Sequence, residues 1–336
     1  MTQATRPYYA PSCEKWRERE APVTRLLIAS AGGHLSELML LAPRLWPTAE
    51  DELWVTFDSA QSRTLLANRR TRLIRNTEPR DWRSVAVNAR VARRLLSEED
   101  VQTVISTGAG VALSFLTVAR TKGIAAHYIE SAARAEAPSM SGRILERVHG
   151  VRLYTQHSEL ADRRWRYAGS VFEGFQTVGV CTPAELRHVF ITVGMREFSF
   201  IGLFERLRAI LPANIDVVVQ AGFDARRLDW PGAQVRSEMS TDELRVAMAE
   251  ADVVVAHAGV GSILTALGEG KVPILVPRRH GRGEHVDDHQ TQIARRLADR
   301  ELAIVADSRT IGLEHFSEAL TRHVEREAVD RKFILQ

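Results

Sequence analysis

Short runs of β-branched and aliphatic residues alternate with stretches of helical periodicity along most of the chain. In the first half, such runs predict strands at residues 25–29, 53–57, 101–106, 126–129 and 151–155. The pattern restarts in the second half, with predicted strands at residues 188–193, 216–220, 252–256, 272–276 and 302–305. Strands that alternate with helices in this way form parallel sheets covered by helices on both faces. The pattern therefore predicts an α/β protein with two doubly wound domains that face each other across a cleft.

The periodic pattern is interrupted once, near the middle of the chain. Residues 174–187 contain two glycines and a proline and show little periodicity, so we interpret them as an interdomain linker. A chain of 336 residues is long enough for two domains of roughly 100–200 residues each. We therefore expect domains at residues 23–173 and 188–325, flanked by a polar N-terminal tail at 1–22 and a C-terminal tail at 326–336.

One helix start is predicted by its capping residues. Ser240 and Glu243 have the spacing of a capping box, in which each side chain accepts a hydrogen bond from the backbone N–H of the other residue. The helix that starts there leads into the predicted strand 252–256. In doubly wound sheets, ligands bind at the carboxyl ends of the strands. We therefore expect the functional residues in the loops that follow the strands.

The composition is that of an ordinary globular protein, with 45% apolar and 26% charged residues. Its two cysteines, Cys13 and Cys181, are too few for a disulfide framework or a thiolate zinc site, which favours a reducing compartment. Residues 1–20 lack the apolar segment of a secretory signal. The longest apolar stretch, residues 109–119, is shorter than the roughly 20 residues that cross a bilayer. We therefore expect a cytoplasmic protein that does not span the membrane.

The charges are distributed unevenly between the two halves. Up to Pro183 there are 25 Lys and Arg against 19 Asp and Glu, whereas the remainder has 20 against 23. A basic first half suits an anionic lipid surface, a pyrophosphate or a nucleic acid, although scattered arginines also occur on any solvated surface. The chain has no nucleic-acid-binding consensus and no zinc-finger spacing, so no nucleic acid partner is expected.

The loop after the first predicted strand carries the first candidate site. Gly32 and Gly33 let the backbone approach a ligand closely, and the helix that follows offers N–H groups to an anion. The spacing is not that of a G-x-G-x-x-G fingerprint, so a nicotinamide cofactor is not expected. His34 follows the glycines, and an imidazole at this place can act as a general base. The alternative is a histidine that caps its own loop.

A second and richer candidate site lies in the other half. A predicted strand runs into a glycine loop at residues 257–262, where a new helix begins. The next strand opens into residues 278–290, which contain three histidines, three arginines and three carboxylates. A packed core does not need such a density of polar groups, so we interpret this loop as a site. His285 and His289 follow Glu284 in the order Glu-His-x-x-x-His, which differs from that of zincins, so no metal is expected.

The chemistry of these loops suits a nucleotide diphosphate. A helix that begins at Gly261 and Ser262 would direct its positive end and its N–H groups at the diphosphate. Glu284 and Asp288 have carboxylates that accept hydrogen bonds from ribose or sugar hydroxyls. Asp287 or Asp288 has the alternative role of N-cap of the following helix.

Several of these motifs together resemble a known family. The second half, from Val193-Gly194 through residues 256–262 to residues 288–290, resembles the nucleotide-binding half of GT-B glycosyltransferases of the MurG-like family 28. Residues 277–290 are most similar to the catalytic subunit of bacterial exopolysaccharide glycosyltransferases. The first half resembles their partner subunit, which is similar to the membrane-recruiting half of the two-subunit eukaryotic enzyme that adds the second GlcNAc to dolichol-pyrophosphate-GlcNAc. The stretches of the first half that match are 32–34, 128–134, 138–142 and 167–172.

The resemblance implies a fusion of two subunits that are usually separate, with a GT-B fold of two Rossmann-like domains. It implies an inverting, metal-independent and cofactor-free transfer from a UDP-sugar to a polyprenyl-pyrophosphate-linked glycan in exopolysaccharide or capsule assembly. The bacterial members favour glucuronate as the donor sugar, whose carboxylate Arg278 and Arg279 would grip with forked hydrogen bonds. The enzyme would act peripherally at the inner face of the cell membrane, through basic and apolar surface of the first domain.

The resemblance also assigns roles to individual residues. The donor side would comprise Gly194, His257, Gly259, Val260, Gly261, Ser262, Arg278, Arg279, Glu284, Asp288, His289 and Gln290. The acceptor side would comprise Gly32, Gly33, Thr107, Gly108, Ser131 and Arg134. His34 is the candidate catalytic base, and Glu130, at the end of a predicted strand, is its rival.

The sequence departs from the family at two points and leaves two other functions open. The acidic residue that family 28 members often place on the ribose falls on Thr265, and Met195-Arg196 replace smaller polar residues. One alternative function is that of a UDP-sugar epimerase, which uses the same two-domain cleft without a lipid acceptor. The other is that of a non-catalytic nucleotide-sugar-binding subunit that recruits a separate transferase.

Overall fold

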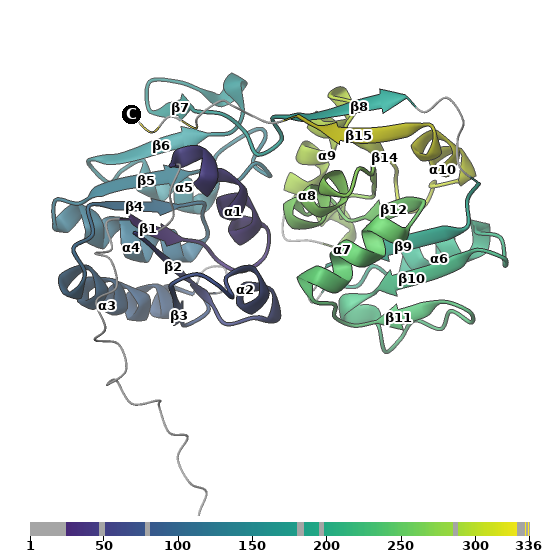
Figure 1. Cartoon of the computed structure of the whole chain (residues 1–336), viewed down its shortest axis with the longest axis horizontal. Coiled ribbons are helices and arrows are strands. Elements are labelled where there is room, and N and C mark those ends of the chain that lie inside the picture. The colour runs from purple at the N-terminus through teal and green to yellow at the C-terminus, as the bar shows by residue number, and fades with distance from the viewer. Residues whose placement is uncertain are drawn as a thin grey trace, which may run out of the picture.

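The chain forms two α/β domains that lie side by side. The structure is a computed structural model that describes residues 25–46, 51–77, 81–179, 185–194, 198–284, 288–327, 333 and 335. Figure 1 shows the first domain in purple to teal and the second in green to yellow, each with helices packed on a central sheet. Both of these sheets are parallel throughout, so the predicted α/β class with two doubly wound domains is confirmed.

The sheet of the first domain has the strand order β3-β2-β1-β4-β5-β6-β7. Its strands are β1 (Arg25–Ile28), β2 (Glu52–Phe57), β3 (Thr71–Ile74), β4 (Thr103–Ser106), β5 (Ala125–Ile129), β6 (Val151–Thr155) and β7 (Trp165–Tyr167). The helices between them are α1 (Gly33–Leu45), α2 (Ala60–Leu65), α3 (Trp82–Glu98), α4 (Gly110–Thr121) and α5 (Met140–Leu145). A short 3-10 turn, η1 (Ser158–Leu160), follows β6.

The second domain repeats this plan with the order β11-β10-β9-β12-β13-β14. Its strands are β9 (His188–Thr192), β10 (Asp216–Gln220), β11 (Gln234–Arg236), β12 (Val253–Ala256), β13 (Ile274–Leu275) and β14 (Ile304–Val305). Its helices are α6 (Ile201–Ile210), α7 (Thr241–Glu250), α8 (Val260–Gly268), α9 (His289–Asp299) and α10 (Leu313–Leu320), with 3-10 turns η2 (Gly222–Asp224) and η3 (His280–Arg282). The predicted capping box is confirmed at the start of α7, where Ser240 and Glu243 exchange hydrogen bonds.

Two further strands form a separate antiparallel ribbon. β8 (Phe175–Gly179) pairs with β15 (Arg322–Arg326), along the top of the second domain in Figure 1. The segment predicted as an irregular linker therefore contains a strand, and the predicted C-terminal tail begins inside one. Beyond β15, Phe333 is buried, and its N–H donates to the carbonyl oxygen of Arg44 in the first domain at 3.1 Å.

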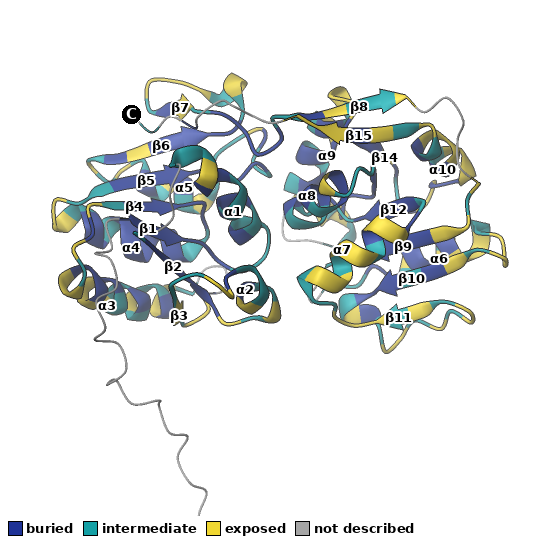
Figure 2. Cartoon of the chain, viewed as in Figure 1, coloured by how far each residue is buried: buried dark blue, intermediate teal, exposed yellow. Residues whose placement is uncertain are grey.

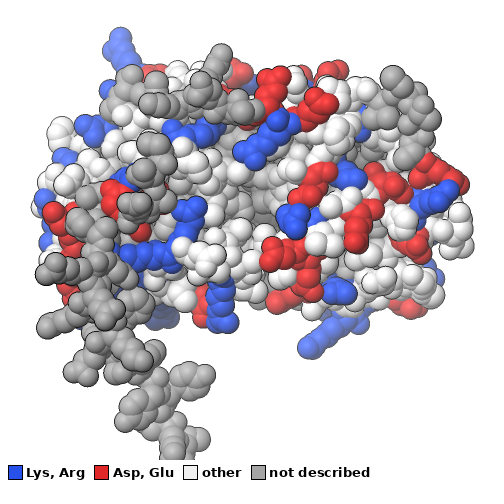
Figure 3. Space-filling view, in the orientation of Figure 1, with Lys and Arg blue, Asp and Glu red and all other residues white. Residues whose placement is uncertain are grey.

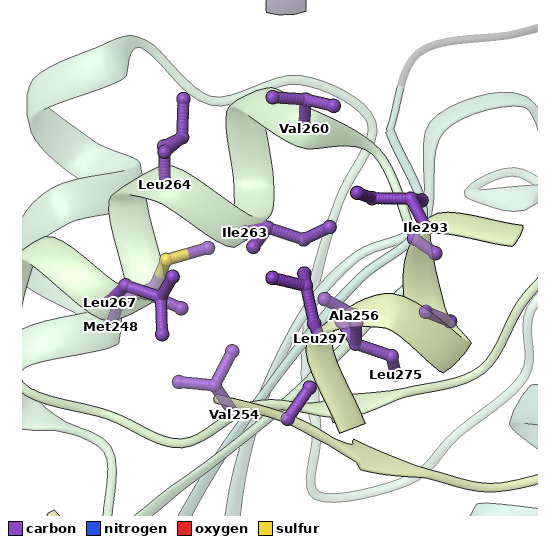
Figure 4. Packing of buried hydrophobic residues seen from close by; sticks show 14 of the residues in the cluster. Met248, Val254, Ala256, Val260, Ile263, Leu264, Leu267, Leu275, Ile293 and Leu297 are labelled. Atoms are coloured by element: carbon purple, nitrogen blue, oxygen red, sulfur yellow. The ribbon is translucent and has the colours of Figure 1, made fainter. Parts of the chain in front are cut away.

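The central strands are buried on both faces, as expected for sheets covered by helices. Figure 2 shows this burial along β1, β4, β9 and β12, with exposed residues on the outer faces of the helices. In the second domain, Ile263 and Leu267 of α8 pack with Val254 of β12 and Leu297 of α9, whereas Leu264 points the other way (Figure 4). No helix in the described ranges is both long enough and apolar enough to span a bilayer.

The strand order fixes where each sheet can bind a ligand. In the first sheet the chain proceeds outward in one direction from β1 and then returns to add β4 on its other side. The second sheet does the same at β9 and β12. The loops after two such strands diverge, which leaves space at the carboxyl edge of the sheet. Both switch points coincide with the glycine loops that the sequence analysis identified.

Candidate active site

The loops after β1 and β4 hold the imidazole of His34 between them. The Nδ1 atom of His34 lies 2.8 Å from the carbonyl oxygen of Thr107, and the hydroxyl of Thr107 donates to the carbonyl oxygen of His34 at 2.7 Å. Because a carbonyl oxygen only accepts, Nδ1 carries a proton and donates it. In the neutral ring, Nε2 then has the lone pair that a general base requires. His34 is half-buried at the start of α1.

The backbone after β4 is shaped around this imidazole. Gly108 has φ +132°, and a Cβ atom there would lie 2.8 Å from Cε1 of His34. Ala109, the next residue, has φ +63°, which is uncommon for a residue with a side chain. Strain of this kind collects at functional sites. The loop that the sequence analysis assigned to the acceptor is therefore packed directly on the candidate base.

The second domain has a comparable arrangement at its own switch point. Gly194, after β9, has φ +71°, and a Cβ atom there would lie 2.8 Å from Cε1 of His257. His257 follows β12, and its backbone N–H donates to the carbonyl oxygen of Thr192 at 3.0 Å. A side chain at Gly259 would also collide with this ring. Each domain thus places a histidine against a glycine with positive φ, at the carboxyl edge of its sheet.

The two glycine loops face each other across the domain boundary. A Cβ atom on Gly33 would lie 3.4 Å from the backbone nitrogen of Gly261, and one on Gly261 would lie 3.6 Å from Cα of Gly33. Neither α1 nor α8 has a side-chain cap at its N-terminus. The positive ends of both helix dipoles therefore meet at the carboxyl edges of the two sheets, where such folds bind ligands. This arrangement suits an anion.

Gln61 of α2 belongs to this site, although the sequence analysis did not identify it. Its side-chain oxygen accepts a hydrogen bond from the N–H of Gly32 at 2.6 Å, and its amide nitrogen donates to the hydroxyl of Ser36 at 3.2 Å. Gln61 therefore fixes the first glycine loop from a neighbouring element. A lone glutamine 29 residues away along the chain gives no signal in the sequence.

The structure corrects the role expected for Arg278. Its side chain is 1% exposed, and its guanidinium donates to the carbonyl oxygens of Val193 and Phe198 at 3.1 and 2.7 Å. It also stacks on the ring of Phe200, 4.6 Å from the centroid. Burial lowers the pKa of Arg278 to about 10, and the charge of Asp224 acts in the opposite direction. Arg278 thus holds the backbone of the segment after β9, and its guanidinium is directed at carbonyl oxygens instead of a sugar carboxylate.

Other polar residues of the 278–290 loop hold the loop itself together. The carboxylate of Glu284 accepts from the N–H of Arg279, and the side-chain oxygen of Gln290 accepts from the N–H of Arg278, both at 2.9 Å. Asp288 stands at the N-cap of α9, but its carboxylate accepts from the N–H of His280 and makes no cap hydrogen bond. The guanidinium of Arg279 pairs with Asp307 at 3.1 Å.

The remaining residues of this loop lie at the ends of helices or outside the described ranges. His289 begins α9 and is half-buried, as are Gly261 and Ser262 in the first turn of α8, whereas Val260 is buried. His285 and Asp287, which bore on the zinc and N-cap alternatives, lie outside the described residues, as do Met195 and Arg196. Within the described part of the chain, no three His, Cys, Asp or Glu side chains are placed to hold a metal ion.

Glu130 has a geometry that favours a structural role over that of rival base. It is 3% exposed, and it accepts hydrogen bonds from the Tyr128 hydroxyl at 3.0 Å and the Ser139 N–H at 2.8 Å. Burial raises its pKa, which opposes the charged form. Ser131 directs its hydroxyl away from solvent onto another buried carboxylate, and half-buried Arg134 follows it in the same loop. Of the two candidate bases, His34 is therefore the better placed.

Comparisons with known sequences give a family match for the second domain. Residues 188–326 match the family model of the glycosyltransferase family 28 C-terminal domain. The UDP-N-acetylglucosamine–N-acetylmuramyl-(pentapeptide) pyrophosphoryl-undecaprenol N-acetylglucosamine transferase of Paracidovorax citrulli is 34% identical over 128 residues, which cover 36% of this chain and 35% of the relative. The UDP-N-acetylglucosamine transferase subunit ALG13 of Yarrowia lipolytica is 38% identical over 86 residues, covering 25% of this chain and 40% of the relative. The matches thus span well under half of these curated relatives.

Comparisons with solved structures extend over both domains. The crystal structure of Acinetobacter baumannii MurG aligns with a TM-score of 0.56 at 20% identity, covering 88% of this chain and 89% of that chain. The UDP-GlcNAc 2-epimerase from Neisseria meningitidis aligns with a TM-score of 0.54 at 10% identity, covering 87% and 97%. These likenesses confirm the predicted GT-B fold. They do not distinguish between activities, because a transferase and an epimerase share the fold. The activity has to be inferred from the residues of the site.

Proposed function

Residues 188–326 form a C-terminal domain of glycosyltransferase family 28 in a chain with the MurG-like GT-B fold, and from this premise we propose that the protein is an inverting glycosyltransferase. It moves a sugar from a UDP-sugar, held by the second domain, to a polyprenyl-pyrophosphate-linked acceptor, held by the first. The observation that carries the proposal is the meeting of the two glycine loops beside an imidazole whose Nδ1 donates to Thr107.

The proposed mechanism is a single displacement at the anomeric carbon. The acceptor hydroxyl attacks this carbon from the face opposite the nucleotide, and Nε2 of His34 takes its proton. The bond from the anomeric carbon to the phosphate oxygen breaks at the same time, and its electron pair leaves with UDP. The N-terminus of α8 stabilises the charge that develops on the diphosphate. The configuration at the anomeric carbon is therefore inverted.

The first domain supplies the groups that suit the acceptor pyrophosphate. The N-termini of α1 and α4 lie next to each other, because β1 and β4 are neighbours in the sheet. Gly32, Gly33, Thr107 and Gly108 form the loops at these two N-termini. Backbone N–H groups at paired helix starts bind phosphate without a requirement for a particular side chain.

The proposal is tested by the variant His34→Asn. Asparagine keeps a hydrogen-bond donor near Thr107 but has no basic nitrogen, so turnover should fall by about 10²–10⁴-fold, the usual contribution of a general base. Affinity for UDP should change less than threefold, because the donor side is untouched. The matched control is His188→Asn, an exposed histidine at the amino end of β9. Equal turnover of the two variants would contradict a catalytic role for His34.

The donor sugar and the pathway are finer proposals. We propose glucuronate as one donor and exopolysaccharide or capsule assembly as the setting, on the resemblance of residues 277–290. The burial of Arg278 removes one of the two arginines that supported a carboxylated sugar, whereas Arg279 stays half-exposed. N-acetylglucosamine is the alternative donor, on the names of the matched relatives. Turnover of UDP-glucuronate measured against UDP-N-acetylglucosamine decides between them.

An epimerase is the second candidate function, because the epimerase from Neisseria meningitidis has the same fold. Epimerisation needs no acceptor, so it predicts that a UDP-sugar is converted when it is incubated with the protein alone. A non-catalytic subunit predicts UDP binding without turnover on any acceptor. The paired glycine loops favour transfer over both, since they provide anion-binding helix ends in the acceptor domain as well as in the donor domain.

We also propose a peripheral position on the inner face of the membrane. Trp82, at the start of α3, is 53% exposed, and Leu73 of the neighbouring edge strand β3 is 45% exposed. β3, the segment after it and α3 also carry the exposed arginines Arg72, Arg75, Arg83, Arg90 and Arg93. A surface that is both basic and apolar suits the headgroups of an anionic bilayer. On the face shown in Figure 3, acidic side chains gather instead around α7 of the second domain.

The fusion and the domain limits remain proposals of the same kind. The first half would correspond to a separate partner subunit and the second to a catalytic subunit, with domains at 23–173 and 188–325. The match of ALG13, a subunit by its name, to a quarter of this chain supports this division. The crossing of the chain between the domains, where β8 and β15 pair, provides the covalent connection that two subunits lack.

A further inference from the structure

Glu37 is a fully buried carboxylate that the proposed mechanism does not use. It lies on α1, one turn after His34, and its side chain is 0% exposed. One oxygen accepts from the Ser131 hydroxyl at 2.6 Å. The other accepts from the Ala132 N–H at 3.0 Å and from the Gln156 side-chain amide at 2.6 Å. These partners are neutral donors that belong to the loops after β5 and β6.

The loop after β5, residues 130–139, is held by two buried carboxylates. Glu37 binds its beginning through Ser131 and Ala132, while Glu130 accepts from the N–H groups of Ser131 and Ser139 and so closes both ends. The peptide of Ala132 is fixed on its other side as well, because its carbonyl oxygen lies 2.8 Å from Nε2 of His157. We call residues 130–139 the β5 loop.

The β5 loop borders the second domain. The carboxylate of Glu136 accepts a hydrogen bond from the Gln292 side chain of α9 at 2.8 Å. Gln156, which donates to Glu37, also accepts from the N–H of Val171 at 2.9 Å, in the stretch that leads towards β8. Glu37 therefore lies at the centre of a network that joins the helix of His34 to the β5 loop and to the crossing between the domains.

A buried carboxylate that holds a loop in place costs desolvation free energy when it is charged. Neutral side chains can accept the same hydrogen bonds without the desolvation penalty of a buried charge. Here, however, two oxygens receive three donors, and a neutral amide has only one acceptor oxygen. The donor set therefore fits the charged form of Glu37 and does not fit glutamine, which points to a requirement for accurate placement of this loop.

We propose that Glu37 is a positioning residue for the acceptor: it sets the β5 loop relative to His34, so that the acceptor hydroxyl meets Nε2. The inference rests on the proposed function. Ser131 and Arg134 of the β5 loop are the acceptor residues that the family resemblance implies, and α1 carries both Glu37 and His34. The positions of the β5 loop and of His34 are therefore both fixed relative to α1.

This arrangement gives acceptor binding a pH dependence of known sign. Burial, with a smaller contribution from the charge of Glu130, raises the pKa of Glu37 to about 7, while its three hydrogen bonds act in the opposite direction. Two titratable groups lie close to it, Glu130 and His157. Arg134 and Tyr128 act on Glu130, and Arg296, Arg300 and Glu159 act on His157. The ionised carboxylate accepts all three donors, so the KM for the acceptor should fall as the pH rises through about 7.

The stability of the fold should change in the opposite direction. Because the pKa of Glu37 is raised in the folded state, its neutral form adds stability below pH 4.5. That contribution is lost as the pH rises through about 7, where the buried group ionises. A purely structural carboxylate would show only this loss, so an improvement of acceptor KM over the same range distinguishes positioning from structure.

The experiment compares Glu37→Gln with Glu52→Gln in the full chain. Glu52 is also a buried carboxylate of the first domain, but it begins β2 at the amino edge of the sheet, where it binds Trp54 and Arg69. Steady-state transfer is measured from pH 6 to 8 with varied UDP-sugar and varied polyprenyl-pyrophosphate acceptor. Hydrogen exchange at the Ala132 amide is followed in parallel.

Glu37→Gln should raise the KM for the acceptor at least tenfold, leave the KM for UDP-sugar within twofold, abolish the pH dependence of the acceptor KM and accelerate exchange at Ala132. Glu52→Gln should lower stability without any of these changes. A wild-type enzyme that transfers sugar, together with equal acceptor KM in both variants, would overturn the role of Glu37 alone. A wild-type protein that transfers no sugar would overturn the proposed function and with it the acceptor role of Glu37.

Discussion

At the scale of single residues, the site depends on small contacts that only glycine permits. Gly108 and Gly194 each lie against a histidine, His34 and His257 respectively, and both have positive φ. His34 and His257 stand in glycine loops at strand ends, which are a local signal in the sequence, whereas Gly108 and Gly194 were expected only from the family resemblance. The sequence analysis misassigned Arg278 and did not identify Gln61 or Glu37, because their partners come from segments far away in the chain.

The variant Gly108→Ala tests the contact with the candidate base. Its Cβ would approach Cε1 of His34 to 2.8 Å, so the imidazole must shift, and we expect turnover to fall at least tenfold. Gly123→Ala is the matched control, because Gly123 also has positive φ, +75°, but has no atom within 4 Å of the added Cβ. Both variants should lose about 1–2 kcal/mol of unfolding free energy. Normal turnover in Gly108→Ala would show that the imidazole position is unimportant.

The variant Arg278→Met tests the structural role of the buried guanidinium. It leaves the carbonyl oxygens of Val193 and Phe198 without their donor, so unfolding free energy should fall by roughly 3–5 kcal/mol. UDP affinity should fall for every sugar alike, because the segment after β9, which carries Gly194 of the expected donor side, loses its support. Arg279→Met, which removes a partly exposed ion pair with Asp307, should cost less than about 1 kcal/mol. A defect confined to UDP-glucuronate would restore the carboxylate-binding role.

At the scale of elements, the hydrophobic pattern predicted the central strands and the edge strand β14, and it missed β3, β7, β8, β11 and β15. Each of the ten predicted strands is present, with ends within two residues, because strands buried on both faces form continuous apolar runs. The edge strands β3 and β11 are short and partly exposed, so they carry no such run. β8 and β15 pair across 142 or more residues of intervening chain. No local pattern in the sequence indicates a pairing over such a distance.

The surface of α3 and β3 makes the membrane proposal testable at the same scale. Trp82→Ser removes the most exposed large apolar side chain of this surface without touching the core. Binding to vesicles that contain anionic lipid should weaken severalfold, because the indole no longer inserts at the interface. Phe223→Ser, an exposed aromatic residue of the second domain, is the control. The proposal would fail if both variants sedimented with vesicles like the wild type.

At the scale of the whole molecule, the two domains repeat one architecture, and we propose that one binds the acceptor and the other the donor. Each sheet provides a switch point, a glycine loop and a helix N-terminus, and the starts of α1 and α8 approach each other across the domain boundary. The resemblance of the sequence to GT-B enzymes predicted this plan. The close approach of Gly33 to Gly261 and the network around Glu37 required the structure, because both depend on how the two domains and their loops are packed.

The proposed activity of the whole molecule is the transfer of a sugar from UDP to a lipid-linked acceptor. The most direct measurement incubates the full chain with a panel of UDP-sugars and a polyprenyl-pyrophosphate glycan, and follows both products by mass spectrometry. We expect one UDP-sugar to extend the acceptor by one sugar residue, with one UDP released for each residue added. Conversion of the UDP-sugar in the absence of acceptor, or binding of UDP with no extended product from any donor, would contradict this expectation.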